Sequence, residues 1–154
     1  MPFSVTETAL PEVLLLQPKV FEDPRGYFFE SFNQRAFQQT TGLVTQFVQD
    51  NQSRSARGVL RGLHYQLRQP QAKLIRVLSG AIFDVAVDLR RSSPHFGQWV
   101  GFTLTATEYQ QAYIPEGFAH GFLVLSDFAE ILYKTSDYWD PTSERTLRWD
   151  DPLV

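Results

Sequence analysis

The stretch AIFDVAVDLR, residues 81–90, is the clearest indication of the fold class in this chain. Its side chains alternate: one face takes Ile82, Asp84, Ala86 and Asp88, and the other takes Phe83, Val85, Val87 and Leu89. A period of two residues is typical of a β-strand, because successive side chains of a strand point to opposite faces. We therefore predict a strand with one apolar face and one face that carries carboxylates.

Similar stretches lie on both sides of this strand. They are rich in β-branched and aromatic residues, and they cover residues 13–21, 26–32, 45–53, 58–67, 73–80, 99–106, 111–117, 120–126 and 129–139. Turn-forming residues separate them at the spacing of a β-sandwich or barrel. Only NQRAFQQTTG (33–42) predicts a helix, with Asn33 as its N-cap and Gly42 at its end. The sequence predicts an all-β jelly roll, whose mouth can hold a ligand.

Length and composition limit the classes of protein. With 154 residues, the chain is expected to form one domain, 1–154. No apolar run approaches the roughly 20 residues of a membrane span, so no membrane partner is expected. Cysteine is absent and no secretory signal is evident, which favours a cytoplasmic protein. A net charge of −3 argues against nucleic acid as a partner.

Basic residues are concentrated in one part of this acidic chain. Between residues 51 and 80 there is no Asp or Glu, and the basic residues are Arg54, Arg57, Arg61, Arg68, Lys73 and Arg76. For any single one of these side chains, the alternative is a solvated position on a strand face. Arginine offers paired donors to phosphate oxygens. Taken together, the group predicts that the barrel binds a small anion such as a phosphate ester.

Two motifs resemble those of cupin-type barrels. GVLRGLHYQLRQPQAKLIRVLSG (58–80) follows the outline of the first cupin motif, and IPEGFAH (114–120) resembles the second. In metal-binding cupins, a second histidine and a glutamate complete the first motif, but here Gln66 and Lys73 occupy those positions. An amide is a poor ligand and an ammonium repels a cation. With only His64 and His120 left, we predict a barrel without a metal or another cofactor.

The chain also resembles the dTDP-4-dehydrorhamnose 3,5-epimerase family over nearly its whole length. The matching segments are KVFEDPRGYFFESFNQRAF (19–37), FVQDNQSRSARGVLRGLHYQL (47–67), KLIRVLSGAIFDVAVDLRRSSPHFGQWVGFTL (73–104), YIPEGFAHGFLVLSD (113–127), ILYKTSDYW (131–139) and ERTLRWDDP (144–152). The resemblance implies a homodimeric, metal-free isomerase of dTDP-L-rhamnose biosynthesis. Its substrate would be dTDP-4-dehydro-6-deoxy-D-glucose, a dTDP-4-keto-6-deoxy sugar, inverted at C3 and C5 to give dTDP-4-dehydro-L-rhamnose.

The resemblance also implies catalytic roles. His64 would remove a proton beside the C4 ketone, Lys73 would stabilise the enolate oxygen, and Tyr133 would return a proton to the opposite face. Tyr138 is a second candidate for the acid. The structural alternatives are a core histidine, a buried ion pair for Lys73 and ordinary packing for Tyr133. Asp84 is as well suited to an ion pair as to orienting a histidine.

Further residues match substrate contacts of the family: Arg25, Phe28, Glu30, Gln49, Asn51, Arg61, His120, Tyr138 and Glu144. The first three belong to a segment that reaches the partner subunit's site in this family; an ordinary edge strand is the alternative. The family pattern continues past residues 144–152 to an acidic residue that pairs with the catalytic histidine, which these 154 residues do not include.

Two other functions fit the same motifs. A related enzyme of another dTDP-deoxysugar pathway would invert a single carbon or act as a ketoisomerase. A non-catalytic sugar-nucleotide-binding cupin would keep Arg25, Asn51 and Arg61 without needing both His64 and Tyr133. The joint presence of His64, Lys73 and Tyr133 favours an enzyme.

Overall fold

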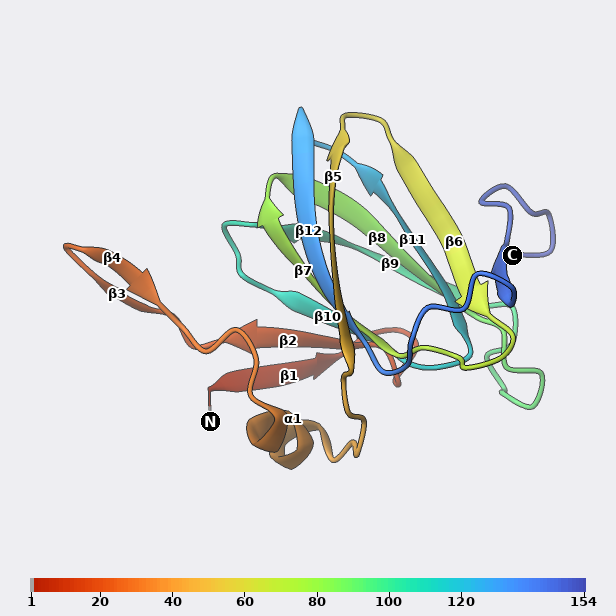
Figure 1. The fold of residues 1–154 in the computed structure, drawn as a ribbon, viewed down its shortest axis with the longest axis horizontal. Coiled ribbons are helices and arrows are strands. Elements are labelled where there is room, and N and C mark those ends of the chain that lie inside the picture. Colours follow the sequence, from red (N-terminus) through yellow and green to blue (C-terminus); the bar gives the residue numbers. More distant parts are fainter. Residues whose placement is uncertain (1) are drawn as a thin grey trace.

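Two antiparallel sheets face each other in the computed structural model of the protein, which describes residues 2–154 (Figure 1). The six-stranded sheet has the order β1 (Phe3–Glu7), β2 (Leu14–Pro18), β10 (Gln111–Ile114), β7 (Lys73–Ser79), β12 (Phe128–Thr135) and β5 (Gln49–Ala56). The five-stranded sheet has the order β13 (Glu144–Thr146), β6 (Leu60–Gln66), β11 (Phe118–Val124), β8 (Ala81–Asp88) and β9 (Trp99–Thr105). The predicted cupin-type jelly roll is confirmed.

A separate hairpin projects from this body. It consists of β3 (Phe21–Asp23) and β4 (Gly26–Phe28), which pair only with each other (Figure 1). Its aromatic side chains are largely exposed, with Phe28 at 68%. The strand predicted at residues 26–32 therefore ends early, because the residues after Phe28 leave the hairpin and lead to the helix.

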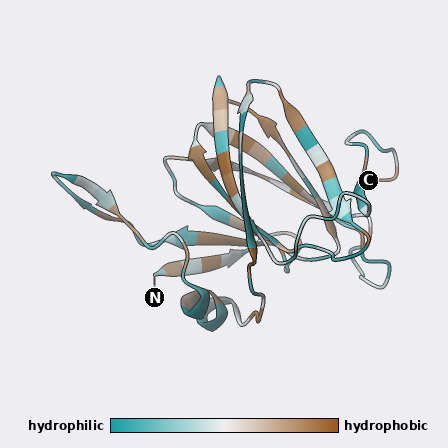
Figure 2. Ribbon diagram, viewed as in Figure 1, coloured by the Kyte–Doolittle hydropathy of each residue, from teal (hydrophilic) through white to brown (hydrophobic). Residues whose placement is uncertain are grey.

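The helix α1 (Gln34–Thr41) lies outside the six-stranded sheet, and both of its predicted ends are confirmed. The Asn33 side chain accepts a hydrogen bond from the Ala36 amide at 3.1 Å, and Gly42 adopts a left-handed conformation with φ 74°. Phe37 is fully buried beside Leu74. Figure 2 shows hydrophilic residues over most of α1 and hydrophobic residues along the strands that face each other. No helix in the described part of the chain is long and apolar enough to cross a membrane.

The strand predicted at residues 81–90 is β8, and it is its carboxylate face that points inward. Asp84 and Asp88 are both 0% exposed, whereas Phe83 and Val85 are partly exposed. The barrel tolerates these buried charges because each carboxylate has a basic partner, His120 for Asp84 and Arg90 for Asp88. The alternation is thus confirmed, but polarity alone does not say which face is buried.

Two short strands have no counterpart among the predicted strands. They are β1, which pairs with β2, and β13, which pairs with β6. The three residues of β13 (ERT) are too few to show a strand pattern. The five residues of β1 (FSVTE) do alternate, with Phe3 and Val5 on one face, and that signal was missed.

Candidate active site

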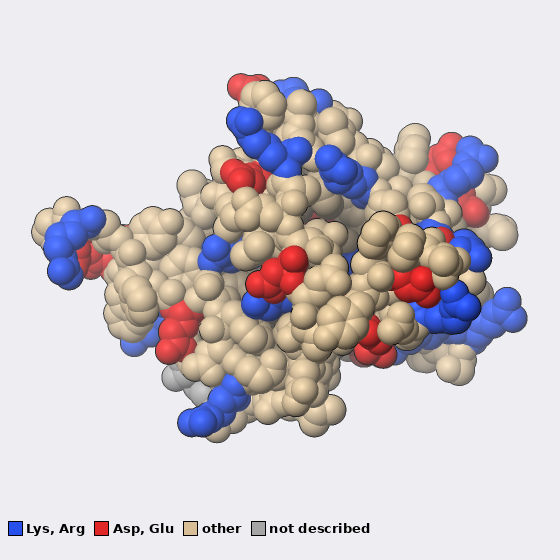
Figure 3. Space-filling view, viewed as in Figure 1, with Lys and Arg blue, Asp and Glu red and all other residues tan. Residues whose placement is uncertain are grey.

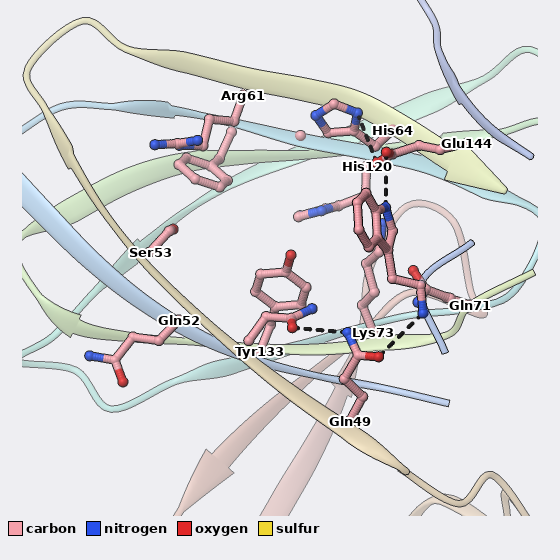
Figure 4. A pocket seen from close by; sticks show the side chains of 14 residues that line it. Gln49, Gln52, Ser53, Arg61, His64, Gln71, Lys73, His120, Tyr133 and Glu144 are labelled. Atoms are coloured by element: carbon pink, nitrogen blue, oxygen red, sulfur yellow. Dashed lines mark hydrogen bonds and ion pairs between the residues drawn. The ribbon is translucent and has the colours of Figure 1, made fainter. Parts of the chain in front are cut away.

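A cavity of about 320 Å³ opens between the two sheets (Figure 4). One wall comes from β5, β7 and β12, and the other from β6, β11 and β13. Fourteen residues line it: Gln49, Asn51, Gln52, Ser53, Arg61, His64, Gln71, Lys73, His120, Gly121, Phe122, Tyr133, Trp139 and Glu144. This volume lies at the lower end of the range of about 300–1,000 Å³ that is usual for small-molecule sites.

Strand register accounts for the convergence of these side chains. His64 and His120 are direct partners across β6 and β11, and Tyr133 is the partner of Asn51 across β12 and β5. Partners in an antiparallel pair lie on the same face of the sheet. Lys73, the first residue of β7, adds its side chain to the same cavity.

His64 has a carboxylate and a hydroxyl close to one of its ring nitrogens. Its Nδ1 lies 3.5 Å from Oε1 of Glu144 and 3.4 Å from Oγ1 of Thr146. The other carboxylate oxygen of Glu144 accepts a hydrogen bond from the Trp139 indole at 3.0 Å. Partial burial is the main cause that lowers the pKa of His64 below its ordinary value. A neutral imidazole, which can accept a proton, is therefore favoured at neutral pH.

Lys73 is a buried cation within this cavity, with only 9% of its surface exposed. Burial lowers its pKa to about 8, and the nearby carboxylates of Glu144 and Asp84 oppose that shift. At neutral pH the ammonium still predominates. A buried ammonium that lines the cavity is placed to stabilise negative charge on a ligand.

Tyr133 faces the cavity from the six-stranded sheet, whereas His64 belongs to the five-stranded sheet. Figure 4 shows the phenol of Tyr133 directed into the cavity. Burial is the main cause that raises the pKa of Tyr133, so the phenol keeps its proton at neutral pH. A proton acceptor and a proton donor thus face one cavity from opposite walls.

Hydrogen bonds hold the polar side chains of the cavity wall in place. Arg61 donates from Nε to the Ser55 hydroxyl at 2.8 Å, which leaves its terminal nitrogens for a ligand. Gln49 donates to Asn51 at 2.9 Å and accepts from the Trp139 backbone amide at 3.2 Å. These contacts connect β5 to the segment after β12 along the edge of the cavity.

His120 pairs with a carboxylate behind the cavity wall. Its Nε2 lies 2.9 and 3.0 Å from the two carboxylate oxygens of Asp84. Both residues are buried. Of the alternatives for Asp84 raised by the sequence, the geometry selects contact with a histidine.

Four of the residues predicted as substrate contacts do not line the cavity. Arg25 and Phe28 lie on the projecting hairpin, where Arg25 pairs with Asp23, and Glu30 accepts a hydrogen bond from Asn33 beside α1. Tyr138 is 59% exposed, and its neighbour Trp139 lines the cavity instead. Within this chain the structure therefore places all four outside the cavity, because the hairpin projects and the segment after β12 turns outward.

The six basic residues of 51–80 do not gather around the cavity within this chain. Only Arg61 and Lys73 line the cavity. Figure 3 shows basic and acidic side chains interspersed over one face of the molecule. The other four basic residues contact other groups: Arg57 pairs with Asp127, Arg68 with Asp140, and Arg54 and Arg76 lie over Phe128 and Phe29. Alternation along the strands and the intervening turns distributes these residues over different faces.

Several cavity residues were not identified from the sequence. They are Gln52, Ser53, Gln71, Gly121, Phe122 and Trp139. Ser53 follows Gln49 and Asn51 at a period of two, so alternation on β5 was a usable signal for it. Gln71 and Trp139 lie in loops, where no periodicity indicates which way a side chain points.

The two residues at would-be metal-ligand positions act differently in the structure. The Gln66 side chain donates to the Gln69 and Tyr138 carbonyls and accepts from the Asp140 amide, so it holds two loops together. Lys73 presents a cation to the cavity. Residues 2–154 contain no group of three or more His, Cys, Asp or Glu arranged to hold a metal ion. A barrel without a metal remains a prediction.

Comparison with known proteins gives one consistent result. Residues 7–154 match the model of the family described as dTDP-4-dehydrorhamnose 3,5-epimerase. The chain is 63% identical over 147 residues to the dTDP-4-dehydrorhamnose 3,5-epimerase of Pseudomonas aeruginosa. The aligned region covers 96% of this chain and 81% of that relative.

Solved structures agree with this match. The dTDP-6-deoxy-D-glucose-3,5-epimerase of Legionella pneumophila, in complex with dTDP-4-keto-L-rhamnose, superimposes with a TM-score of 0.96 at 49% identity over 98% of this chain and 80% of that one. ChmJ, a 3'-monoepimerase of Streptomyces bikiniensis in complex with dTDP-quinovose, superimposes with a TM-score of 0.87 at 33% identity. That match covers 95% of this chain and 74% of the other. As its motifs predicted, the chain belongs to the dTDP-4-dehydrorhamnose 3,5-epimerase family, which is a family of isomerases.

Proposed function

We propose that this chain, acting as one domain over residues 1–154, inverts C3 and C5 of dTDP-4-dehydro-6-deoxy-D-glucose to give dTDP-4-dehydro-L-rhamnose. The observation that carries the proposal is the pairing of His64 and Tyr133 on opposite walls of one cavity, with the cation of Lys73 between the sheets. Inversion at carbon requires a proton acceptor on one face of the sugar and a proton donor on the other.

His64 begins the reaction as the base. The hydrogens on C3 and C5 are acidic because each carbon neighbours the C4 ketone. His64 takes one proton on its ring, and the electrons of the broken C–H bond move into the carbonyl, which becomes an enolate with its charge on O4. Glu144 and Thr146 lie beside Nδ1 of His64, so Nε2 is the nitrogen that accepts the proton.

Lys73 stabilises the enolate and Tyr133 ends the step. The ammonium of Lys73 offsets the charge on O4 where it develops. Tyr133 then donates its proton to the carbanionic carbon from the other face. Before the second carbon reacts, the imidazolium of His64 releases its proton to solvent and the phenolate of Tyr133 regains one from solvent. Its raised pKa supports this role, because the phenol is protonated when the enolate forms.

The remaining wall residues hold the nucleotide sugar. Arg61 has donors suited to the diphosphate, while Gln49, Asn51, His120 and Glu144 provide hydrogen-bonding groups for the sugar and the base. Exposed Tyr138 lies beside the mouth residue Trp139, where a ring can stack on the thymine. We assign no metal or cofactor to any step.

The experiment is to follow the dTDP-4-keto sugar by NMR in D₂O with the purified protein. Deuterium is expected at both C3 and C5, together with inversion of both centres. A sugar that binds but exchanges no hydrogen would refute the enzyme assignment and leave a binding protein.

Inversion of a single carbon is the second candidate, supported by the 33% identical 3'-monoepimerase of Streptomyces bikiniensis. A monoepimerase and a 3,5-epimerase use the same acid and base, so their residue types do not separate them. The NMR experiment does separate them, because a monoepimerase would invert one centre only. The 63% identity to a 3,5-epimerase favours two inversions.

We also propose that the protein is a homodimer in which the β3–β4 hairpin reaches the partner's cavity. Arg25, Phe28 and Glu30 match substrate contacts but lie outside this chain's own cavity, and the hairpin projects from the body (Figure 1). The exposed aromatic side chain of Phe28 supports this, because a surface of this kind is typical of an interface.

Mixing two inactive variants tests this arrangement. A variant with Arg25→Ala and Phe28→Ala would lack the hairpin contacts, and a His64→Asn variant would lack the base. If the hairpin acts on the partner, a 1:1 mixture that exchanges subunits recovers about a quarter of wild-type activity, since half the dimers hold one intact site. A monomer mass by light scattering, or no recovery after subunit exchange, would contradict the proposal.

A further inference from the structure

Asp84 is a buried carboxylate to which the proposed mechanism gives no role. It lies in the middle of β8 and is fully buried, with both oxygens 2.9–3.0 Å from Nε2 of His120. An ionised carboxylate only accepts hydrogen bonds, so this contact requires the proton of the neutral imidazole to be on Nε2. Nδ1 is then the ring nitrogen left for a ligand in the cavity that His120 lines.

Asp88 gives a direct comparison on the same face of the same strand. It is equally buried, but Arg90 donates to it from Nε at 3.0 Å and from a terminal nitrogen at 2.8 Å, and the Arg90 backbone amide donates at 2.9 Å. That set neutralises and satisfies the carboxylate, and Asp88 does not line the cavity. Asp84 has instead an imidazole of the cavity wall as its partner. Packing of the interior alone does not require a buried carboxylate that pairs with an imidazole of the cavity wall.

Lys73 is the buried cation of the same cavity. Burial lowers the pKa of Lys73, and the carboxylates of Glu144 and Asp84 are the two groups that raise it again. The other titratable or charged groups around the cavity are Arg61 and His64 from β6, His120 from β11 and Tyr133 from β12. Of the two carboxylates, Glu144 is partly exposed to solvent, whereas the charge of Asp84 is buried and less screened.

We propose that Asp84 is a positioning residue of the epimerisation site: it holds His120 as the Nε2–H tautomer, with Nδ1 toward the substrate. This inference rests on the proposed function, because it assigns Asp84 a purpose in the same cavity. Asp84 does not line the cavity, so it acts through His120 rather than on the sugar.

The first test compares the His120 ring and kcat/KM in Asp84→Asn, with Asp88→Asn as the matched control. Asparagine keeps the volume and removes the charge. With Asp84→Asn, the ring proton of neutral His120 is expected to leave Nε2 in part of the molecules, and kcat/KM is expected to fall by at least about tenfold, as for an imidazole that loses its orienting carboxylate. With Asp88→Asn the ring proton stays on Nε2 and kcat/KM stays close to that of the wild type, even if the protein melts at lower temperature. The same His120 tautomer and the same kcat/KM in both variants would overturn the inference.

The second test needs no variant and no turnover. In ¹⁵N-labelled wild-type protein above the pKa of the ring, His120 is expected to carry its proton on Nε2, with Nδ1 unprotonated. A proton on Nδ1 would overturn the inference, whether or not Asp84→Asn folds. Absence of epimerisation by the wild type would refute the proposed function, and the tautomer measurement would still decide whether Asp84 sets the state of His120.

Discussion

The interior of the barrel has two halves that differ in chemistry although the same strands build both. On β7, Lys73 faces the cavity while Ile75 and Val77, two and four residues further on, are buried in the main apolar cluster. On β12 the order is reversed, with Ile131 in that cluster and Tyr133 in the cavity. A shift of two residues along a strand thus separates a core position from a site position.

The difference shows how the fold can contain a site whose buried charge lowers the stability of the folded state. The apolar half gains roughly 1.5–3 kcal/mol for each large side chain that it removes from water. The cavity half keeps a cation out of water, and the lowered pKa of Lys73 reports that cost. Stability should therefore depend on the apolar half and the reaction on the cavity half, and the following predictions test this separation.

The largest effect is expected for His64→Asn. Removing the base should lower kcat by at least about 10²-fold and abolish deuterium exchange at both C3 and C5. His64 is only half-buried, so the free energy of unfolding should change little. His95→Asn is the control, because His95 lies outside the cavity and should leave exchange unaltered. Exchange that persists in His64→Asn would mean that another group is the base.

Lys73→Met is the sharpest test of the separation. Methionine has nearly the same shape but no charge, so the enolate loses stabilisation and the rate should fall by about 10²–10³-fold. The same change removes a buried cation, so the protein should be at least as stable in chemical unfolding. Lys134→Met, on the outer face of β12 and paired with Asp50, is the control and should keep its rate. Loss of both rate and stability would indicate that the two halves are not separate.

Tyr133→Phe should uncouple exchange from inversion. The enolate still forms, and His64 can return a proton to the original face, so deuterium should enter while the yield of inverted product falls by about 10²-fold. Tyr113→Phe, which removes a hydroxyl bonded to Thr45 outside the cavity, should leave the ratio of exchange to inversion unchanged. Exchange and inversion that vanish together would contradict the assignment of Tyr133 as the acid.

Prediction from the sequence succeeded where local chemistry specifies the answer. Asn33 and Gly42 determine the ends of α1 through contacts within a few residues, so both were predictable. The alternation of β8 was predictable too, but not its inward face, because His120, the partner that makes buried Asp84 tolerable, comes from β11. Arg90, the partner of Asp88, is only two residues away in the sequence. Non-local partners are what a single sequence leaves out.

The site was predictable only in part, for a related reason. His64, Lys73 and Tyr133 were named through motifs, and the structure places all three in one cavity. Composition alone did not locate the site, since the basic residues of 51–80 diverge once strands and turns direct them to different faces. Trp139 joins the cavity through a loop, for which neither alternation nor composition gives a signal.

The pH profile of kcat/KM should be bell-shaped, with a tenfold loss for each unit beyond either limb. His64 must be neutral, so activity falls as the pH drops through its pKa, which burial places below the ordinary value of 6.5. Lys73 must be charged, so activity falls as the pH rises above its pKa of about 8. A profile that is flat from pH 7 to 10 would show that the Lys73 cation is not needed. Lys73→Met should lack the alkaline limb.

The smallest effect is expected for Ile131→Val, two residues from Tyr133 on the same face of β12. Ile131 is buried in the apolar half, and the loss of one methylene there should cost about 0.5–1.5 kcal/mol of unfolding free energy. The backbone pairing of β12 with β5 and β7 is unaffected, so Tyr133 should keep its position and the exchange rate per folded molecule should stay within about twofold. Chemical unfolding and deuterium exchange on the same sample measure both quantities. Because a displacement of about 1 Å in a catalytic group can reduce a rate 10²-fold, even this small change is a sensitive probe. A tenfold slower exchange with normal folding would show that packing in the apolar half determines the position of the acid, and that the two halves work as one.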